Sequence, residues 1–275
     1  MYVDDAGVPR SRSWRPAPAL VASAGLHAGA AAWAVVTPAQ WPVALGIVAA
    51  NHAVLAAAGL WPRSRLLGPN LLRLPPQAAG RAEVSLTVDD GPDPDVTPAV
   101  LDMLDRYRAR ASFFCIGERA QRYPDLCREI IARGHSIENH TQHHSPWFSF
   151  LGMRGFAREI GAGQETITRI AGQAPMFFRA PAGLRNPLLE PVLARLGLQL
   201  AAWTRRGFDT VTRDPATVAR RLLRGLAARD ILLLHDGNAA RSHTGVKVVL
   251  EALPRVLDGI AARDLRSVTL REGAK

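Results

Sequence analysis

The sequence is poor in cysteine, with two in 275 residues, so it predicts no disulfide framework. Cys115 lies in the apolar segment ASFFCIG and Cys127 in the helix-like segment PDLCREII. Both positions fit unpaired, buried thiols. Internal repeats and low-complexity tracts are also lacking, apart from a bias toward alanine. The length therefore predicts one globular domain and an additional segment.

Charged residues are missing from a long stretch near the N-terminus. Residues 16–62 contain no Asp, Glu, Lys or Arg, and two apolar runs, 19–36 and 41–60, fill this span. Each run approaches the roughly 20 residues that a helix needs to cross a bilayer. A signal peptide would account for the first run but not for the second. We therefore expect a two-helix membrane hairpin; the alternative, given the high alanine content, is a soluble helical hairpin packed on the domain.

The net charge of +10 is unevenly distributed. Residues 1–82 hold seven Arg and two Asp, whereas residues 83–275 hold 27 Lys or Arg and 22 Asp or Glu. Half of the excess thus lies in the first third of the chain. A nucleic-acid-binding protein would carry a basic stripe across its folded domain, so the distribution argues against this class. Anionic lipid or a phosphorylated substrate fits the distribution better.

The basic residues flank the apolar segment at both ends. Arg10, Arg12 and Arg15 precede it, Arg63 and Arg65 follow it, and the turn between the two runs carries no charge. By the positive-inside rule both ends, and with them the large domain, face the cytoplasm of a bacterial-type inner membrane. The expected organisation is a basic tail at 1–15, a membrane hairpin at 16–62, a linker rich in Pro, Gly and Ala at 63–82, and a catalytic domain at 83–272.

Short β-rich runs alternate with amphipathic helical segments after residue 83. The expected strands are 84–88, 111–116, 176–180, 198–203, 231–235 and 266–270. The expected helices are 96–109, 118–134, 153–171, 187–196, 215–228 and 245–262. This alternation predicts an α/β fold with a parallel sheet. About seven units in this length favour a distorted β/α barrel, with a doubly wound open sheet as the alternative.

Side chains able to do chemistry follow the ends of the expected strands. Asp89 and Asp90 end the first one, and the segment ENHTQHH contains His140, His143 and His144. On a helical turn His140 can pair with His143 or His144 around one metal ion, because residues three or four apart share a face. Two imidazoles and one carboxylate leave positions open for water and substrate, as at catalytic zinc. One Asp would complete the site and the other would remove a proton from water; the alternatives are a surface histidine cluster and an Asx turn.

Four motifs, in this order, resemble those of the polysaccharide deacetylase family, the NodB-homology group of carbohydrate esterases (family 4). The resemblance covers about residues 83–272. TVDDG is similar to T-F-D-D-G with Val88 in place of Phe, HTQHH to H-[ST]-x-x-H, RAPAG to R-x-P-[YF]-G except at Ala182, and LLH to the last motif.

The resemblance implies a role for each matching residue of the first three motifs. Asp90, His140 and His144 would bind the metal, which is usually zinc, with Co²⁺, Mn²⁺ or Ni²⁺ as alternatives. Asp89 would be the general base, and Arg179 would pair with it and orient it.

Further roles follow from the same resemblance. His235 would be the general acid that protonates the leaving amine, and Asp209 would tune it. Thr141 would shape the metal-binding turn, Leu233 would line the pocket for the acyl methyl group, and the backbone N–H of Ala182 would serve the oxyanion.

Departures from the family pattern bear on the substrate. Ala182 replaces an aromatic residue, Thr210 replaces a frequent Trp, and Glu138 replaces a frequent Gly. The first two open or reshape the sugar groove, which disfavours a long polymer such as chitin and favours a lipid-linked sugar presented at the membrane. Arg205 and Arg206 follow an expected strand end and are candidates for contact with a phosphate; a solvated face is the alternative.

These observations predict a metal-dependent hydrolase that removes an N-acyl group, in the first instance N-acetyl, from an amino sugar of a cell-envelope glycan or glycolipid. The alternatives are a deformylase of a lipid-linked formamido sugar and a catalytically inactive carbohydrate-binding module. The expected partners are the amino-sugar substrate and membrane lipid, without nucleic acid and without a predicted protein partner.

Overall fold

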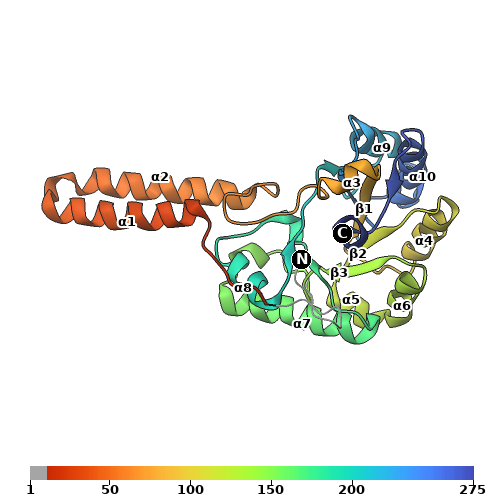
Figure 1. The fold of residues 1–275 in the computed structure, drawn as a ribbon, viewed down its shortest axis with the longest axis horizontal. Helices are drawn as coiled ribbons and strands as arrows, with labels where there is room; N and C mark the ends of the chain where they lie inside the picture. The colour runs from red at the N-terminus through yellow and green to blue at the C-terminus, as the bar shows by residue number, and fades with distance from the viewer. Residues whose placement is uncertain (1–10) are drawn as a thin grey trace.

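Two antiparallel helices project from the body of the molecule (Figure 1). The computed structural model describes residues 11–275, so Arg10 and most of the predicted basic tail lie outside the described residues. Helix α1 spans Pro18–Val36 and α2 spans Trp41–Leu60, joined by the 3₁₀ turn η1, Pro38–Gln40. Only 11% of the apolar window in α1 and 17% of that in α2 are buried within the described chain. Both helices are long and apolar enough to cross a bilayer.

Polar contacts join the two helices near the middle of the hairpin. The Nε2 atoms of His27 and His52 lie 3.1 Å apart, and Asn51 Nδ2 donates to Ser23 Oγ at 2.8 Å. Each polar group thus finds a partner on the other helix, as expected for helices that pack together in an apolar environment.

The body is a β/α barrel that is interrupted at one point. Its strands are β1 (Glu83–Asp89), β2 (Ala111–Cys115), β3 (Ser136–Asn139), β4 (Phe177–Phe178), β5 (Gln199–Leu200), β6 (Arg205–Arg206), β7 (Ile231–His235) and β8 (Arg266–Ser267). They pair in the order β5-β4-β3-β2-β1-β7-β6, all parallel, with β8 beside the start of β1. This is the order of a barrel opened between β5 and β6. The predicted distorted barrel of about seven parallel strands is confirmed, and the doubly wound sheet is not observed.

Helices cover the outside of the sheet (Figure 1). They are α4 (Thr97–Arg106), α5 (Gly117–Arg122), α6 (Pro124–Ala132), α7 (Met153–Ala171), α8 (Leu189–Leu196), α9 (Pro215–Leu223) and α10 (Val248–Ala261). Short 3₁₀ turns, η2 (Phe148–Phe150) and η3 (Pro181–Gly183), lie in the loops. Central strands β1, β2 and β7 are buried along their whole length, which explains their continuous apolar runs.

Two expected elements differ from the structure at identifiable residues. The helix expected at 118–134 is divided into α5 and α6 at Tyr123, because Pro124 disfavours helical geometry in the residue before it. The strand expected at 266–270 ends at Ser267, since Thr269 caps the short helix α11, Leu270–Gly273, in a capping box with Glu272.

The segment after the hairpin fills the gap in the barrel. Leu71 forms a parallel bridge with Ala201, just after β5, and Arg73 forms an antiparallel bridge with Asp230, just before β7. Helix α3, Gln77–Gly80, then leads into β1. Residues 63–82, predicted only as a linker, therefore supply backbone partners to strands that the open sheet leaves unpaired.

The hairpin is attached firmly to the barrel. Arg185 N donates to the carbonyl of Gly59 at 3.1 Å, and a Cβ atom at Gly59 would lie 2.2 Å from the Arg185 carbonyl oxygen. Before the hairpin, Arg12 forms an ion pair with the buried Glu190 of α8. Both ends of the hairpin thus pack against the part of the barrel around α8.

Candidate active site

The carboxyl ends of several strands converge on one small cavity. It has a volume of about 190 Å³ and is lined by Asp89, Asp90, His140, His144, Ala180, Ala182, Gly183, Trp203, Arg206, Thr210, Leu233, His235 and Asn238. Because all strands are parallel, residues that follow them meet at one end of the barrel, where β/α enzymes carry their reactive groups.

Asp90, His140 and His144 form a cluster that can hold a cation. Their ligand atoms all lie within 4.8 Å of one another, and Asp90 Oδ1 is 3.2 Å from Nε2 of each histidine. The Nδ1–H of His140 donates a hydrogen bond to the carbonyl oxygen of Arg179 at 2.8 Å, which leaves the Nε2 lone pair on the side of Asp90. Asp90 Oδ1 is buried without a hydrogen-bond donor aligned to it in residues 11–275. A buried orphan oxygen beside two imidazole nitrogens is the donor set of a divalent metal ion such as zinc.

The charges around Asp90 favour its ionised form. Burial raises the pKa of the Asp90 carboxyl, but the imidazoles of His140, His235 and His144 outweigh burial and hold that pKa well below its usual range. Burial lowers the pKa of His140, yet the carboxylates of Asp90 and Asp89 raise it overall. For His144, burial and the charge of His140 lower the pKa. An ionised carboxylate and an adjacent neutral imidazole are the protonation states that metal binding needs.

The two neighbouring histidines of the motif face different ways. His144 N donates to Thr141 Oγ1 at 2.8 Å, which directs His144 to Asp90, whereas His143 Nδ1 lies 3.1 Å from Glu159 on α7. The segment is a loop with left-handed residues at Thr141 (φ 67°) and His144 (φ 52°). The prediction that His140 and its partner lie on one helical turn is therefore wrong, because positive φ angles interrupt any helix there.

Arg179 holds the second carboxylate. Its guanidinium donates to Asp89 Oδ1 at 2.6 Å and to Thr87 Oγ1 at 2.8 Å, and its remaining bonds go to the carbonyls of Ala201 and Ala202 at 3.1 Å. Burial lowers the pKa of Arg179, while the charge of Asp89 opposes that shift. Asp89 Oδ2 lies 4.0 Å from His140 Nε2, so one oxygen is fixed by Arg179 and the other faces the candidate metal position.

A histidine that lines the cavity is paired with a buried aspartate. His235 ends β7, and its Nδ1 lies 2.9 Å from Oδ1 of the fully buried Asp209. The backbone N–H of His235 donates to Asp209 Oδ2 at 2.7 Å. Burial lowers the pKa of His235, but the hydrogen bond to Asp209 and the nearby carboxylates raise it overall. The imidazole can thus carry a proton toward the cavity through Nε2.

The remaining predicted site residues occupy distinct places. Ala182 lines the cavity with a left-handed backbone (φ 54°), and Leu233 lines it with a buried side chain. Thr210 lines it as well, whereas Thr141 is buried behind the histidines. Glu138 lies away from the cavity, where it accepts hydrogen bonds from Phe177 N and Arg271 and fastens β3 to β4.

Sequence reasoning missed Asn238 as a site residue. Its Nδ2 donates to Asp90 Oδ2 at 2.9 Å, which fixes the carboxylate that faces the histidines. It lies three positions after His235, and its proximity to the last motif was the only available indication. Trp203, the last residue of an expected strand, was likewise not predicted as a site residue, although it lines the cavity.

Comparison with known sequences gives consistent results. A family profile described as polysaccharide deacetylase matches residues 77–201. A peptidoglycan-N-acetylglucosamine deacetylase of Bacillus cereus is 33% identical over 191 residues, which are 69% of this chain and 86% of the relative. A chitooligosaccharide deacetylase of Sinorhizobium fredii is 34% identical over 168 residues, which are 61% of this chain and 78% of the relative.

Solved structures share the fold. A peptidoglycan N-acetylglucosamine deacetylase superposes with a TM-score of 0.66 at 27% identity, covering 74% of this chain and 91% of that one. A family 4 carbohydrate esterase from Streptomyces lividans in complex with acetate superposes with a TM-score of 0.62 at 29% identity, covering 70% of this chain and 95% of that one. The similarity to these two structures therefore covers 74% and 70% of this chain.

Proposed function

Because the chain belongs to the polysaccharide deacetylase family, we propose that it is a metal-dependent hydrolase which removes an N-acetyl group from an amino sugar of a cell-envelope glycan or glycolipid. The observation that carries the proposal is the cluster of Asp90, His140 and His144 within 4.8 Å, with Asp89 held beside it by Arg179. The motif resemblance found in the sequence is confirmed by the family match.

Asp90, His140 and His144 would hold the ion. When bound, a divalent ion such as Zn²⁺ polarises a carbonyl oxygen and lowers the pKa of water. Asn238 fixes Asp90, and the Arg179 carbonyl fixes His140, so the donor atoms are oriented before an ion arrives.

The two remaining acid–base groups divide the proton transfers. Asp89 accepts a proton from the attacking water through the oxygen that Arg179 leaves free. His235, whose pKa is raised by its hydrogen bond to Asp209, donates a proton to the departing nitrogen, and Asp209 keeps its ring oriented. The Ala182 N–H stabilises the oxyanion, a contribution of about 3 kcal/mol in comparable sites. Leu233 packs against the acyl methyl group.

We further propose that the hairpin places this site at a bacterial inner membrane, with the barrel on the cytoplasmic side. The two apolar helices and the arginines that flank them support this placement. A site at the membrane suits an amino sugar carried on a lipid. The cavity wall has the small residues Ala182 and Thr210 where the family pattern has aromatic residues, which disfavours binding of a long polymer.

Product analysis of the full chain in nanodiscs tests the activity. We expect acetate release from N-acetylglucosamine linked to a short polyprenyl diphosphate, and little from soluble chitooligosaccharides. Formate release from a formamido sugar would replace the deacetylase by a deformylase with the same residues. Absence of both products, with metal bound, would indicate a carbohydrate-binding module and would contradict the proposal.

A further inference from the structure

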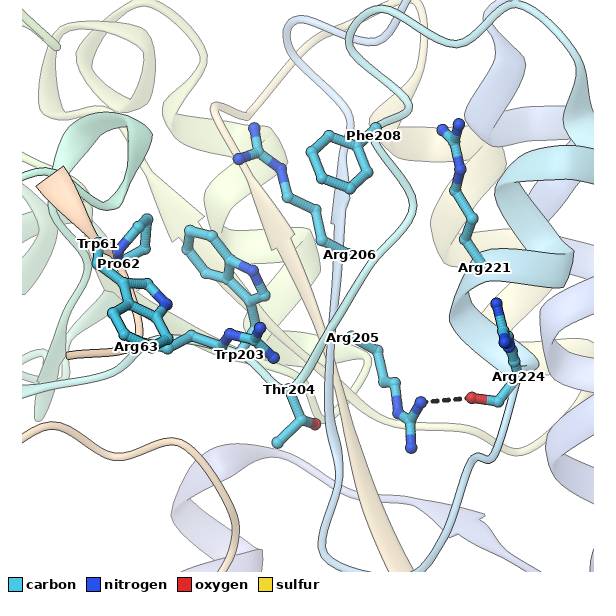
Figure 2. Close-up of a pocket in the computed structure, with 10 residues that line it drawn as sticks. All are labelled: Trp61, Pro62, Arg63, Trp203, Thr204, Arg205, Arg206, Phe208, Arg221 and Arg224. Carbon is cyan, nitrogen blue, oxygen red and sulfur yellow. Dashed lines mark hydrogen bonds between the residues drawn. The ribbon is translucent and has the colours of Figure 1, made fainter.

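A second, larger cavity adjoins the active site. It measures about 570 Å³ and is formed by three segments distant in sequence: residues 61–63 after the hairpin, residues 203–208 around β6, and residues 221–224 at the end of α9 (Figure 2). No role in the proposed reaction uses it.

Positive charge dominates this cavity. Its walls carry five arginines and, among the residues that line it, no acid: Arg63, Arg205, Arg206, Arg221 and Arg224. Five guanidinium groups around one space repel one another unless an anion joins them. The arrangement therefore favours an anionic ligand.

One of these arginines is structural and the others have unused donors. Arg205 is paired with the buried Asp230 at 2.9 Å and donates to the carbonyls of Arg224 and Gly225. By contrast, the side chains of Arg63 and Arg224 make no hydrogen bond or ion pair within residues 11–275. Arg221 donates to Thr212 Oγ1 at 2.7 Å but faces no carboxylate.

Arg206 is held in place by stacking. Its guanidinium carbon lies 4.9 Å from the ring centre of Phe208 and 5.4 Å from that of Trp203, and its buried Nε lacks a hydrogen-bond partner in the described chain. A guanidinium stacked on aromatic faces keeps its edge donors free for a planar or tetrahedral oxyanion.

The cavity is continuous with the active site and with the hairpin. Trp203 and Arg206 line both this cavity and the catalytic one. Trp61 and Pro62 follow α2 immediately, and a Cβ atom at Gly183 would lie 2.6 Å from Pro62 and 2.7 Å from Trp203. If α2 spans the bilayer, the cavity lies at the membrane surface, at the level of lipid phosphates.

We propose that this arginine cavity binds the phosphate or diphosphate group attached to the amino sugar of a lipid-linked substrate while the sugar occupies the catalytic cavity. The proposal rests on the proposed function for the identity of the sugar. Arginine recognises phosphate through paired N–H···O bonds, and Arg206 lies where the two cavities meet, so a phosphate on the sugar reaches the arginines without leaving the active site. Exposed Trp61 and Phe208 flank the site as aromatic residues at a membrane interface would.

Binding to the full chain in phosphatidylcholine nanodiscs tests this site directly. The probes are N-acetylglucosamine 1-phosphate and, as its neutral counterpart, methyl N-acetylglucosaminide. We expect the phosphorylated probe to bind more tightly, and the double variant Arg63→Gln/Arg224→Gln to lose about tenfold or more of that preference. Affinity for the neutral probe should stay unchanged, because neither residue lines the catalytic cavity.

The matched control is Arg65→Gln/Arg220→Gln, which removes two exposed arginines close in sequence to Arg63 and Arg224 that do not line the cavity. It should retain the preference. Equal affinity for the two probes in the unmodified chain, or an unchanged preference in the first double variant, would overturn the proposal. Loss of the preference in phosphatidylglycerol nanodiscs would also overturn it, because the arginines would then bind bulk lipid headgroups.

Acetate release is measured on the same samples and separates the two claims. Phosphate-dependent binding without acetate release would contradict the proposed function and leave the arginine site standing. Acetate release at equal rates from both probes, with equal binding, would contradict the arginine site and leave the deacetylase standing.

Discussion

Arg179 donates a hydrogen bond of 2.6 Å to Asp89, and both side chains are buried at the end of the barrel. Through this pair, the adjacent carboxylates of Asp89 and Asp90 acquire different surroundings. Asp89 is neutralised by a fixed guanidinium, while Asp90 lies 3.2 Å from two imidazoles. Different surroundings give neighbouring carboxylates different tasks, as in other hydrolases that use two acids.

Replacing Asp89 by Asn should abolish proton removal and leave the cation site intact. We expect kcat to fall about a hundred- to ten-thousand-fold, the range for loss of a general base. Metal content should equal that of the unmodified chain, because Asp90 and both histidines are unchanged. Steady-state kinetics with metal analysis checks this, and loss of the metal in Asp89→Asn would assign Asp89 to the ligand set instead.

Arg179→Met should destabilise the barrel strongly. It leaves the buried Asp89 carboxylate without its counter-ion, which costs about 3–5 kcal/mol when one partner of a buried pair is removed. Urea unfolding followed by tryptophan fluorescence measures the change. The control is Arg133→Met, which breaks contacts with exposed Asp102 and Asp105 and should cost about 1 kcal/mol or less. Similar losses in both variants would contradict the account.

Gly183→Ala tests the contact between the hairpin connection and the active site. Gly183 has φ of 75°, and an added Cβ would meet Pro62 and Trp203 within 2.7 Å. The control Gly172→Ala has φ of 66° and no atom within 4 Å of the added Cβ, so it isolates backbone strain of about 1–2 kcal/mol. We expect Gly183→Ala to lose about 1–3 kcal/mol more, from overpacking. Equal losses in the two variants, measured by urea unfolding, would show that Pro62 does not pack there.

His135 should make the barrel less stable in mild acid. Burial lowers its pKa from 6.5 to about 4, and its Nδ1 accepts a hydrogen bond from Ala111 N at 3.2 Å. The unfolded chain therefore takes up a proton at this site before the folded chain does, and stability falls as pH drops from 6.5 toward 4. The loss is about 2–3 kcal/mol for a shift of this size.

The variant His135→Asn keeps a hydrogen-bond acceptor but does not titrate. Its unfolding free energy should fall less steeply than that of the unmodified chain between pH 6.5 and 4. The matched control His243→Asn changes an exposed histidine and should follow the unmodified chain. Parallel pH profiles for His135→Asn and the unmodified chain would refute the role given to burial.

The sequence predicts the parts of this molecule that depend on local pattern. Helix α7 was expected at 153–171 and spans Met153–Ala171, because its apolar residues recur at helical spacing without an internal proline. Strand β6 was not predicted, since Arg205–Arg206 is two residues long and lacks an apolar run. Backbone pairing with β7, rather than side-chain composition, makes Arg205–Arg206 a strand.

The rest of the site depends on tertiary contacts, which leave no pattern in the local sequence. Helical spacing leaves His143 and His144 as alternatives beside His140, and the resemblance of HTQHH to the family motif selects His144. The structure adds the partner of His143, because the loop with left-handed residues at Thr141 and His144 places His143 beside Glu159. The arginine cavity likewise gathers residues from three segments between positions 61 and 224, and the local sequence pattern indicates only Arg205 and Arg206 among them.

The central claim is that Asp90, His140 and His144 hold one divalent ion on which hydrolysis depends. The direct measurement is metal content per chain, together with acetate release, for the unmodified protein, His144→Ala and the control His143→Ala, whose imidazole pairs with Glu159 outside the cavity. We predict a single bound ion and activity in the unmodified protein and in His143→Ala, and loss of both in His144→Ala. Equal metal content and equal activity in all three proteins would contradict the account.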